Sequence, residues 1–193
     1  LRVNSNGKGP VSAEWMIPKA LWLKQNEPEV FERAATICEY QDYLNLHLTG
    51  RLVGSINNLS TRWHYDFSEG NRVSNKSIPV SLLEKLELAD LVQKWPSEVL
   101  RLGELVGGLT TDAAEHLGLP IGLKVVQGGA DAQIGMIGLG VVKPGNLALI
   151  TGSSHLQLGL SEKPFHGDGI WGTYAEALLP GMHTVEGGQT STG

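Results

Sequence analysis

The chain has 193 residues and a formal net charge of −5, which gives enough length for one or two domains with a sizeable core. Its 15 Lys and Arg residues are scattered along the sequence, and this excludes a basic surface for nucleic acid or anionic membrane. No stretch approaches the about 18 apolar residues of a membrane helix, and residues 1–5 show no signal-peptide pattern, so we expect a cytoplasmic protein.

The single cysteine, Cys38, limits the chemistry further. One cysteine excludes an intrachain disulfide and a cysteine-based zinc site. The six histidines show no pair at the spacing of helical metal ligands. We therefore expect no built-in metal site.

The first part of the chain is predicted to be a layer of helices. Residues 1–12 are rich in Asn, Gly, Ser and Pro and are expected to form a loop. Pro18 and Pro28 are well placed at helix starts. Residues 41–48 form a third helical run, which Gly50 is expected to end.

Residues 56–66 combine polar and aromatic side chains. Such a segment either lines a site or forms a capped turn with Trp63 and Tyr65 packed inward, and the pattern alone leaves both interpretations open. Trp15 and Trp22 have two interpretations, as ligand contacts or as core residues, and the core is the expected one because aromatic side chains at such positions usually lie there.

The middle of the chain is predicted to be helical as well. Residues 68–77 are expected to form a loop, and Pro79 leads into an amphipathic helix. Residues 105–109 are expected to close the helical region. Thr111 is predicted to cap a further helix that ends at Gly118.

The chain is organised around a short motif that follows residues 124–127, a predicted buried strand. Gly128 and Gly129 allow unusual backbone angles and the approach of another molecule. Asp131 then stands at the start of a helix, where the unpaired amides and the dipole favour a carboxylate. Taken alone, Asp131 is as consistent with a helix cap as with a catalytic group.

A β-rich region follows. Residues 147–151 and 156–160 are predicted strands, with 173–175 and 184–186 as later short ones. The Gly-Ser-Ser turn at 152–154 is either a simple hairpin connection or a cradle for an anion, because the N–H groups of such turns converge. It is not a Walker A loop, since no Lys follows in the required pattern.

A serine hydrolase is not expected. No Gly-x-Ser-x-Gly elbow is present. His155 directly follows Ser154 on an alternating strand, which points the two side chains to opposite faces.

Taken together, these motifs resemble the FGGY family of carbohydrate kinases, with ribulokinases the most similar branch. The resemblance is carried by the following segments: Ser12-Ala13-Glu14-Trp15, Pro18-Lys19-Ala20-Leu21-Trp22-Leu23-Lys24, Gly128-Gly129-Ala130-Asp131-Ala132, the glycines Gly135, Gly138 and Gly140, Lys143-Pro144-Gly145, Ile150-Thr151-Gly152-Ser153-Ser154, Gly181, and Glu186-Gly187-Gly188-Gln189.

The resemblance implies an α/β chain of the actin-like (ribonuclease H-like) ATPase fold of sugar kinases. Residues 1–145 would be the end of the N-terminal, sugar-binding lobe, and residues 146–193 the start of the C-terminal, nucleotide-binding lobe. The chain would then be a middle segment of a longer protein, without the first phosphate hairpin and the adenosine-binding half.

The resemblance also implies roles for individual residues. Asp131 would be the base that accepts the proton of the sugar hydroxyl. Arg62, Asp131 and Glu186 would bind the sugar, although Arg62 stands where the ribulokinase pattern has a lysine. Gly152, Ser153 and Ser154 would contact the phosphates of ATP, with Mg²⁺ arriving on the nucleotide.

The implied function is ATP-dependent phosphorylation of a ketopentose such as ribulose or xylulose, or of a polyol. Sugar and ATP are the expected partners, and the oligomeric state, including a homodimer, is left open. Two alternatives are a non-catalytic sugar- or nucleotide-binding regulatory protein on the same fold and a purely structural domain. Asp131 favours the enzyme, because a kinase homologue that has lost catalytic activity does not require this carboxylate.

Overall fold

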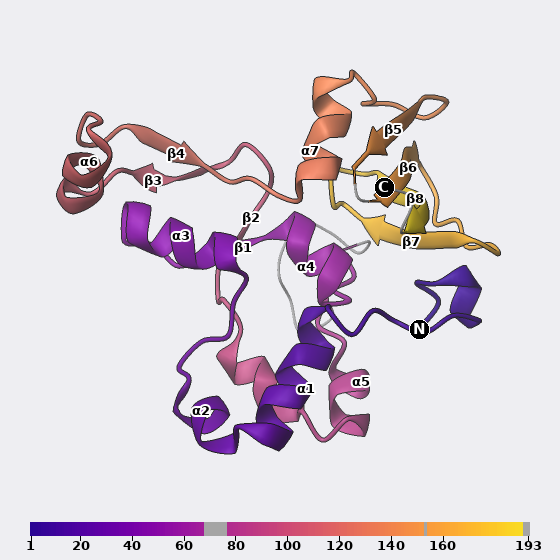
Figure 1. Ribbon diagram of the computed structural model, residues 1–193, viewed down its shortest axis with the longest axis horizontal. Coiled ribbons are helices and arrows are strands. Elements are labelled where there is room, and N and C mark those ends of the chain that lie inside the picture. Colours follow the sequence, from indigo (N-terminus) through magenta and orange to yellow (C-terminus); the bar gives the residue numbers. More distant parts are fainter. Residues whose placement is uncertain (68–76, 153, 191–193) are drawn as a thin grey trace.

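The computed structural model describes residues 1–67, 77–152 and 154–190 (Figure 1). Its helices are η1 (Ser5–Gly7), α1 (Met16–Asn26), α2 (Pro28–Arg33), α3 (Tyr40–Thr49), α4 (Ile56–Arg62), α5 (Val80–Lys85), η2 (Ala89–Lys94), α6 (Thr111–Leu117) and α7 (Asp131–Gly138). Its strands are β1 (Gly54–Ser55), β2 (Val99–Leu100), β3 (Leu105–Gly108), β4 (Lys124–Val126), β5 (Leu147–Thr151), β6 (Ser154–Ser161), β7 (Ile170–Ala175) and β8 (His183–Thr190). Among the described residues, no helix has the length and apolar character needed to cross a bilayer.

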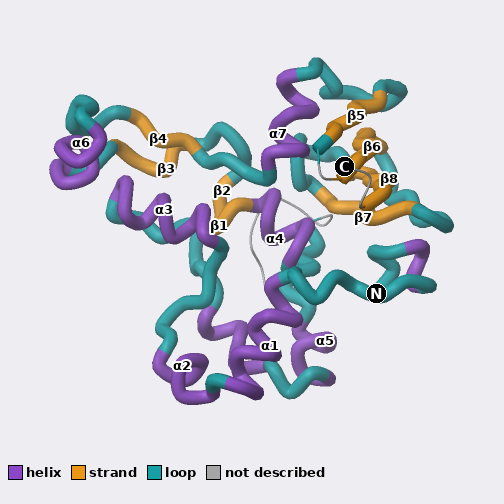
Figure 2. Tube along the Cα trace, viewed as in Figure 1, coloured by secondary structure: helices purple, strands orange, loops and turns teal. Residues whose placement is uncertain are grey.

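The elements form a helical body, an arm and a sheet. Figure 1 shows α1, α2 and α5 together at the bottom, the arm of β3, β4 and α6 at the left, and the strands β5 to β8 at the upper right. The sheet has the order β5-β6-β8-β7 and all its pairs are antiparallel. Helix α4 lies between the helical body and the sheet and contacts β7 (Figure 2).

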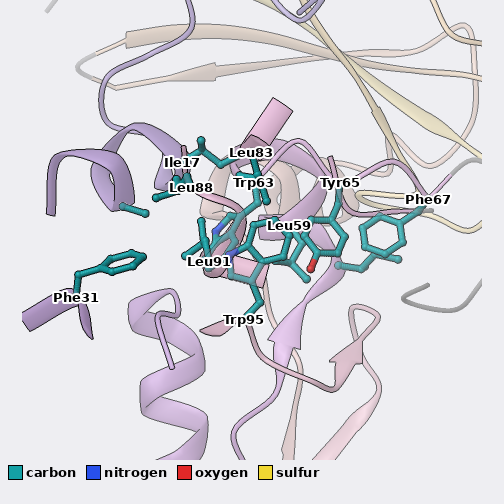
Figure 3. Packing of buried hydrophobic residues seen from close by; sticks show 12 residues of the cluster. Ile17, Phe31, Leu59, Trp63, Tyr65, Phe67, Leu83, Leu88, Leu91 and Trp95 are labelled. Carbon is teal, nitrogen blue, oxygen red and sulfur yellow. The ribbon is translucent and has the colours of Figure 1, made fainter. Parts of the chain in front are cut away.

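The helical body is held by an aromatic and aliphatic core at the end of α4 (Figure 3). The rings of Trp63 and Trp95 meet edge to face at 5.1 Å, and Tyr65 lies 4.8 Å from Trp95. Fully burying one such side chain contributes about 1.5–3 kcal/mol. Because Trp63 anchors the end of α4 in this core, the preceding residue, Arg62, is turned outward and exposed.

A second core joins α7 to the sheet. Met136 of α7 is buried with Ala148 of β5 and with Leu158 and Leu160 of β6. This apolar contact fixes the direction of α7 and so places its first residue, Asp131, near the strands.

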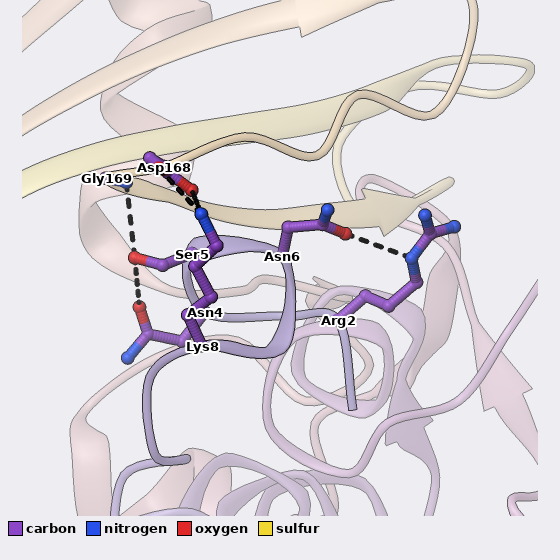
Figure 4. Close-up of polar contacts among 7 residues, drawn as sticks. All are labelled: Arg2, Asn4, Ser5, Asn6, Lys8, Asp168 and Gly169. Atoms are coloured by element: carbon purple, nitrogen blue, oxygen red, sulfur yellow. Dashed lines mark hydrogen bonds and ion pairs between the residues drawn. The ribbon is translucent and has the colours of Figure 1, made fainter.

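The N-terminal segment, predicted as a loop, is tied to the β7 end of the sheet (Figure 4). The ammonium of Lys8 lies 2.7 Å from a carboxylate oxygen of Asp168, and the N–H of Gly169 donates to Ser5 Oγ at 3.2 Å. Both contacts are solvent-exposed, and an exposed ion pair contributes only about 0–1 kcal/mol. Their consequence is positional, because they bring the residues before α1 next to β7.

Several helix ends lie where the sequence predicts them. Gly50 and Gly118 follow α3 and α6 with φ of 74° and 67°, the left-handed region that glycine tolerates. The cap of α6 is Thr110 and not Thr111, since Thr110 Oγ1 accepts a hydrogen bond from the N–H of Ala113 at 3.2 Å.

Other expectations are wrong. Residues 105–108 do not close the helical region but form β3, which pairs antiparallel with β4. Residues 124–126 do form a strand, β4, but it is not buried, since Val126 is 55% exposed. Trp22 is 58% exposed rather than part of the core. The predicted loop at 68–77 lies almost entirely outside the described residues.

Candidate functional site

A cavity of about 350 Å³ lies where α4, α7 and the strands β6, β7 and β8 meet. Arg62, from the end of α4, Asp131, from the start of α7, and Glu186, from the middle of β8, all line it. The three residues predicted to bind a sugar are therefore brought to one cavity from three separate elements. Its volume is at the lower end of the range for small-molecule pockets.

Asp131 is the first residue of α7 and is exposed. It is not the helix cap, which is Ala130 and has no side-chain hydrogen bond. Asp131 Oδ1 accepts a hydrogen bond from the N–H of Ala132 at 2.7 Å. An ionised carboxylate that faces a cavity can accept a proton from a bound hydroxyl group.

The two glycines before Asp131 serve close packing and not unusual backbone angles. Neither has a positive φ. A Cβ on Gly129 would lie 2.6 Å from Asn57 Oδ1, and one on Gly128 would lie 3.3 Å from Gln41 Nε2. The molecule that approaches this backbone is thus the protein itself, through the side chain of Asn57.

Glu186 is a half-buried carboxyl on the cavity wall. Burial raises its pKa above the ordinary value for glutamate. Burial, and then the neighbouring Glu186, also raise the pKa of the Tyr174 hydroxyl. Within the described part of the chain, Glu186 has neither an ion pair nor a hydrogen bond to its side chain. A carboxyl in this state is suited to accept hydrogen bonds from ligand hydroxyl groups.

Arg62 supplies the positive charge of the cavity. It is exposed, while its neighbours Thr61 and Trp63 are buried. No ion pair occupies Arg62 among the residues that the structure describes. Its planar guanidinium presents several donors in a fixed geometry, so it selects for ligand shape more strongly than lysine would.

In the predicted phosphate turn, Gly152 follows β5 and Ser154 begins β6, and neither residue lines this cavity. The N–H of Gly152 donates to the carbonyl of Ser154 at 2.9 Å, inside the turn. Among the described residues, the nearest atom to an added Cβ on Gly152 would be the carbonyl oxygen of Ser154 at 4.0 Å, so there is space beside Gly152. Ser153 lies outside the described residues.

Trp171 and Tyr174, two aromatic residues of the cavity wall, were not predicted as part of the site. Trp15, expected in the core, lines the cavity with Trp171, and their ring centroids are 5.7 Å apart. Tyr174 lines it too, although strand alternation would put Trp171 and Tyr174 on opposite faces. The register of β7 shifts between Gly172 and Tyr174, and such a bulge changes the direction of the side chains that follow.

The described residues contain no cluster of three or more His, Cys, Asp or Glu that would hold a metal ion. The cavity offers the separate carboxyls of Asp131 and Glu186 instead of a cage. This donor set fits Mg²⁺ that is held mainly by phosphate oxygens and water.

Comparison with known proteins gives consistent matches. The model of the N-terminal domain of the FGGY family of carbohydrate kinases matches residues 4–138. The FGGY carbohydrate kinase domain-containing protein of Danio rerio is 37% identical over 200 residues, which cover 96% of this chain and 36% of the relative. The ribulokinase of Shouchella clausii is 30% identical over 186 residues, which cover 96% of this chain and 32% of that enzyme.

A solved structure supports the fold. The xylulose kinase from Rhodospirillum rubrum aligns with a TM-score of 0.73 at 24% identity, over 94% of this chain and 35% of that one. This likeness confirms the predicted actin-like fold. The chain spans about a third of the length of the curated relatives it matches.

Proposed function

Because this chain belongs to the FGGY family of carbohydrate kinases, we propose that the protein containing it transfers the γ-phosphoryl group of ATP to a hydroxyl group of a small sugar. The observation that carries this proposal is the cavity lined by Asp131, Arg62 and Glu186. A base, a cation and a hydrogen-bond acceptor around one small cavity are the groups that phosphorylation of a sugar hydroxyl requires.

The substrate class is a ketopentose such as ribulose or xylulose, or a polyol. Relatives named ribulokinase and xylulose kinase support this class. The mixed lining supports it as well, because the rings of Trp15 and Trp171 offer apolar surface to C–H groups while Glu186 and Arg62 offer partners to hydroxyl groups. The arginine at position 62 favours a sugar other than ribulose within this class, since arginine and lysine are not interchangeable in a polar pocket.

In the proposed reaction, the carboxylate of Asp131 accepts the proton of the attacking hydroxyl group. As that oxygen bonds to the γ-phosphorus, the bond from this phosphorus to the bridging oxygen breaks and ADP leaves. Arg62 and Glu186 orient the sugar so that one hydroxyl group reaches Asp131. Gly152, Ser153 and Ser154 are proposed to contact the phosphates of ATP, and the bound Mg²⁺ supplies charge neutralisation there.

We place the boundary between the sugar-binding and nucleotide-binding lobes near residue 145, so that residues 1–145 and 146–193 belong to different lobes. The end of the family-model match at residue 138 supports this division. The protein is proposed to act in the cytoplasm, where ATP and small sugars are available.

The test is a panel of pentuloses and polyols incubated with ATP and the complete protein, with ADP formation as the readout. The proposal expects one or a few sugars to give ADP and a phosphorylated product. Sugar binding in calorimetry without ADP from any member of the panel would support the regulatory alternative instead. If no sugar of the panel binds and no ADP forms, the structural alternative is supported.

A further inference from the structure

Asn57 of α4 is fully buried and uses its side-chain amide on three partners. Its Oδ1 accepts a hydrogen bond from the N–H of Ala130 at 2.9 Å. Its Nδ2 donates to Gln133 Oε1 at 2.6 Å and to the carbonyl of Ala177 at 2.8 Å. One side chain therefore joins α4, the start of α7 and the segment after β7.

These partners stand on both sides of Asp131. Ala130 precedes Asp131 and is the cap of α7, and its own side chain makes no cap hydrogen bond. Gln133, which follows it, is also buried and lines the cavity. The position of Asp131 relative to α4 is thus defined by hydrogen bonds of Asn57 to the residue before it, Ala130, and to Gln133, two residues after it.

The fit around Asn57 is tight. A Cβ on Gly129 would lie 2.6 Å from Asn57 Oδ1, 2.7 Å from its Cγ and 2.9 Å from its Cβ. Gly129 has no positive φ, so its backbone admits an alanine, and the three atoms nearest to the added Cβ all belong to Asn57. Gly129 and Asn57 are therefore two sides of one contact, which can be changed independently from either side.

We infer that Asn57 is a positioning residue, which holds the carboxylate of Asp131 at a fixed place relative to Arg62 on the same helix α4. The inference rests on the proposed function, in which Asp131 is the base and Arg62 binds the sugar. Loss of the contact lets the start of α7 shift against α4, and displacement of a reacting group by about 1 Å can cost about 10²-fold in rate. ATP affinity should change little, because neither Gly152 nor Ser154 lines the cavity.

The experiment is a double-mutant cycle in the complete protein with Asn57→Ala, Gly129→Ala and the double variant. Each single variant is expected to lower kcat by about 10²-fold, with KM for ATP within about twofold of wild type. The double variant should be slower than Asn57→Ala by much less than Gly129→Ala is slower than wild type, because Oδ1 and Cγ of residue 57 are then absent and only its Cβ, at 2.9 Å, still meets the added methyl group. Additive losses, about 10⁴-fold together, would overturn the inference.

Asn58→Ala is the matched control. Asn58 is the next residue of α4, is also buried, and donates one hydrogen bond to Gln41 Oε1 at 3.0 Å. Its loss should lower the melting temperature and leave kcat within about twofold, because it bonds no residue next to Asp131. A fall in kcat equal to that of Asn57→Ala would show that any buried amide of α4 matters equally, which contradicts a positioning role.

Gly129→Ala keeps the inference testable even if Asn57→Ala does not fold, because it removes no polar group. Wild-type kcat in Gly129→Ala would overturn the inference. Asp131→Asn, measured beside it, separates the two proposals. If kcat falls in Asp131→Asn but not in Gly129→Ala and Asn57→Ala, the positioning role of Asn57 is rejected and the proposed base stands. If Asp131→Asn keeps its activity, the proposed role of Asp131 as the base is rejected.

Discussion

Replacing Asp42 by asparagine should stabilise the protein above neutral pH. Asp42 lies in the first turn of α3 and is 1% exposed. Burial raises the pKa of its carboxyl to about 7, and the nearby Glu39 carboxylate adds to this, while backbone N–H groups of Glu39 and Ser55 oppose it. Glu39 in turn accepts a hydrogen bond from Trp63 Nε1 at 2.8 Å, so the surroundings of Asp42 contact the core that anchors α4.

The direction of the change in stability with pH follows from the order in which the folded and unfolded states ionise. The folded carboxyl has a pKa of about 7 and the unfolded one about 3.9, so between these values the unfolded state loses its proton first. Stability therefore falls as pH rises through this window, by at most about 4 kcal/mol for about three pH units. Below pH of about 4 both states are protonated and the difference vanishes.

Asparagine keeps the shape and an acceptor for the N–H of Glu39, which donates to Asp42 Oδ2 at 3.1 Å, but it cannot ionise. Asp42→Asn should therefore match wild type near pH 4, exceed it by up to about 4 kcal/mol at pH 8, and show a flatter pH dependence. Urea unfolding of the complete protein, followed by tryptophan fluorescence at several pH values, measures this. Asp112→Asn, an exposed residue in the first turn of α6, is the control. Parallel pH profiles of Asp42→Asn and wild type would refute the reasoning.

Three further predictions concern the proposed reaction. Asp131→Asn should lower kcat by about 10²–10⁴-fold and change sugar affinity far less; turnover within about threefold of wild type would exclude Asp131 as the base. Glu186→Ala should weaken sugar binding by about 10–150-fold in calorimetry with ATP affinity unchanged, while Arg62→Lys should alter the ranking of sugars; unchanged values would assign both side chains to the solvated surface. A bulky residue at Gly152 should raise KM for ATP before KM for sugar, and equal effects would indicate general misfolding.

The sequence predicted helix boundaries well where a glycine or proline stands at the boundary itself. Gly50 and Pro28 act through their own backbone geometry, so no distant contact is needed to interpret them. Strand β3 was missed because Leu-Val-Gly-Gly has no alternating pattern, and its strand state depends on pairing with β4, residues 124–126, which the sequence did predict as a strand.

The candidate site depended on resemblance rather than on spacing. Nothing in the local sequence of Arg62, Asp131 or Glu186 indicates that they line one cavity, because they lie on elements that only tertiary packing brings together. Asn57 lies in the polar and aromatic segment 56–66, but nothing in that segment marked Asn57 itself as important. A buried amide on a helix has the same sequence appearance as a solvated one, and only its partners distinguish them.

The hydrogen bonds of Asn57 and the lining of the cavity involve overlapping parts of the fold. The cavity draws Arg62 from α4, Asp131 from α7 and Glu186 from β8, and Asn57 joins α4 to α7 and to Ala177, which lies between β7 and β8. The groups are thus held near one another before any ligand binds. The raised pKa of Glu186 means that this arrangement costs stability in the free protein, and hydrogen bonds from ligand hydroxyl groups would offset that cost. When the elements of a site are already fixed, less of the binding free energy is offset by the entropy cost of ordering them. More of it can then orient the reacting hydroxyl group toward Asp131.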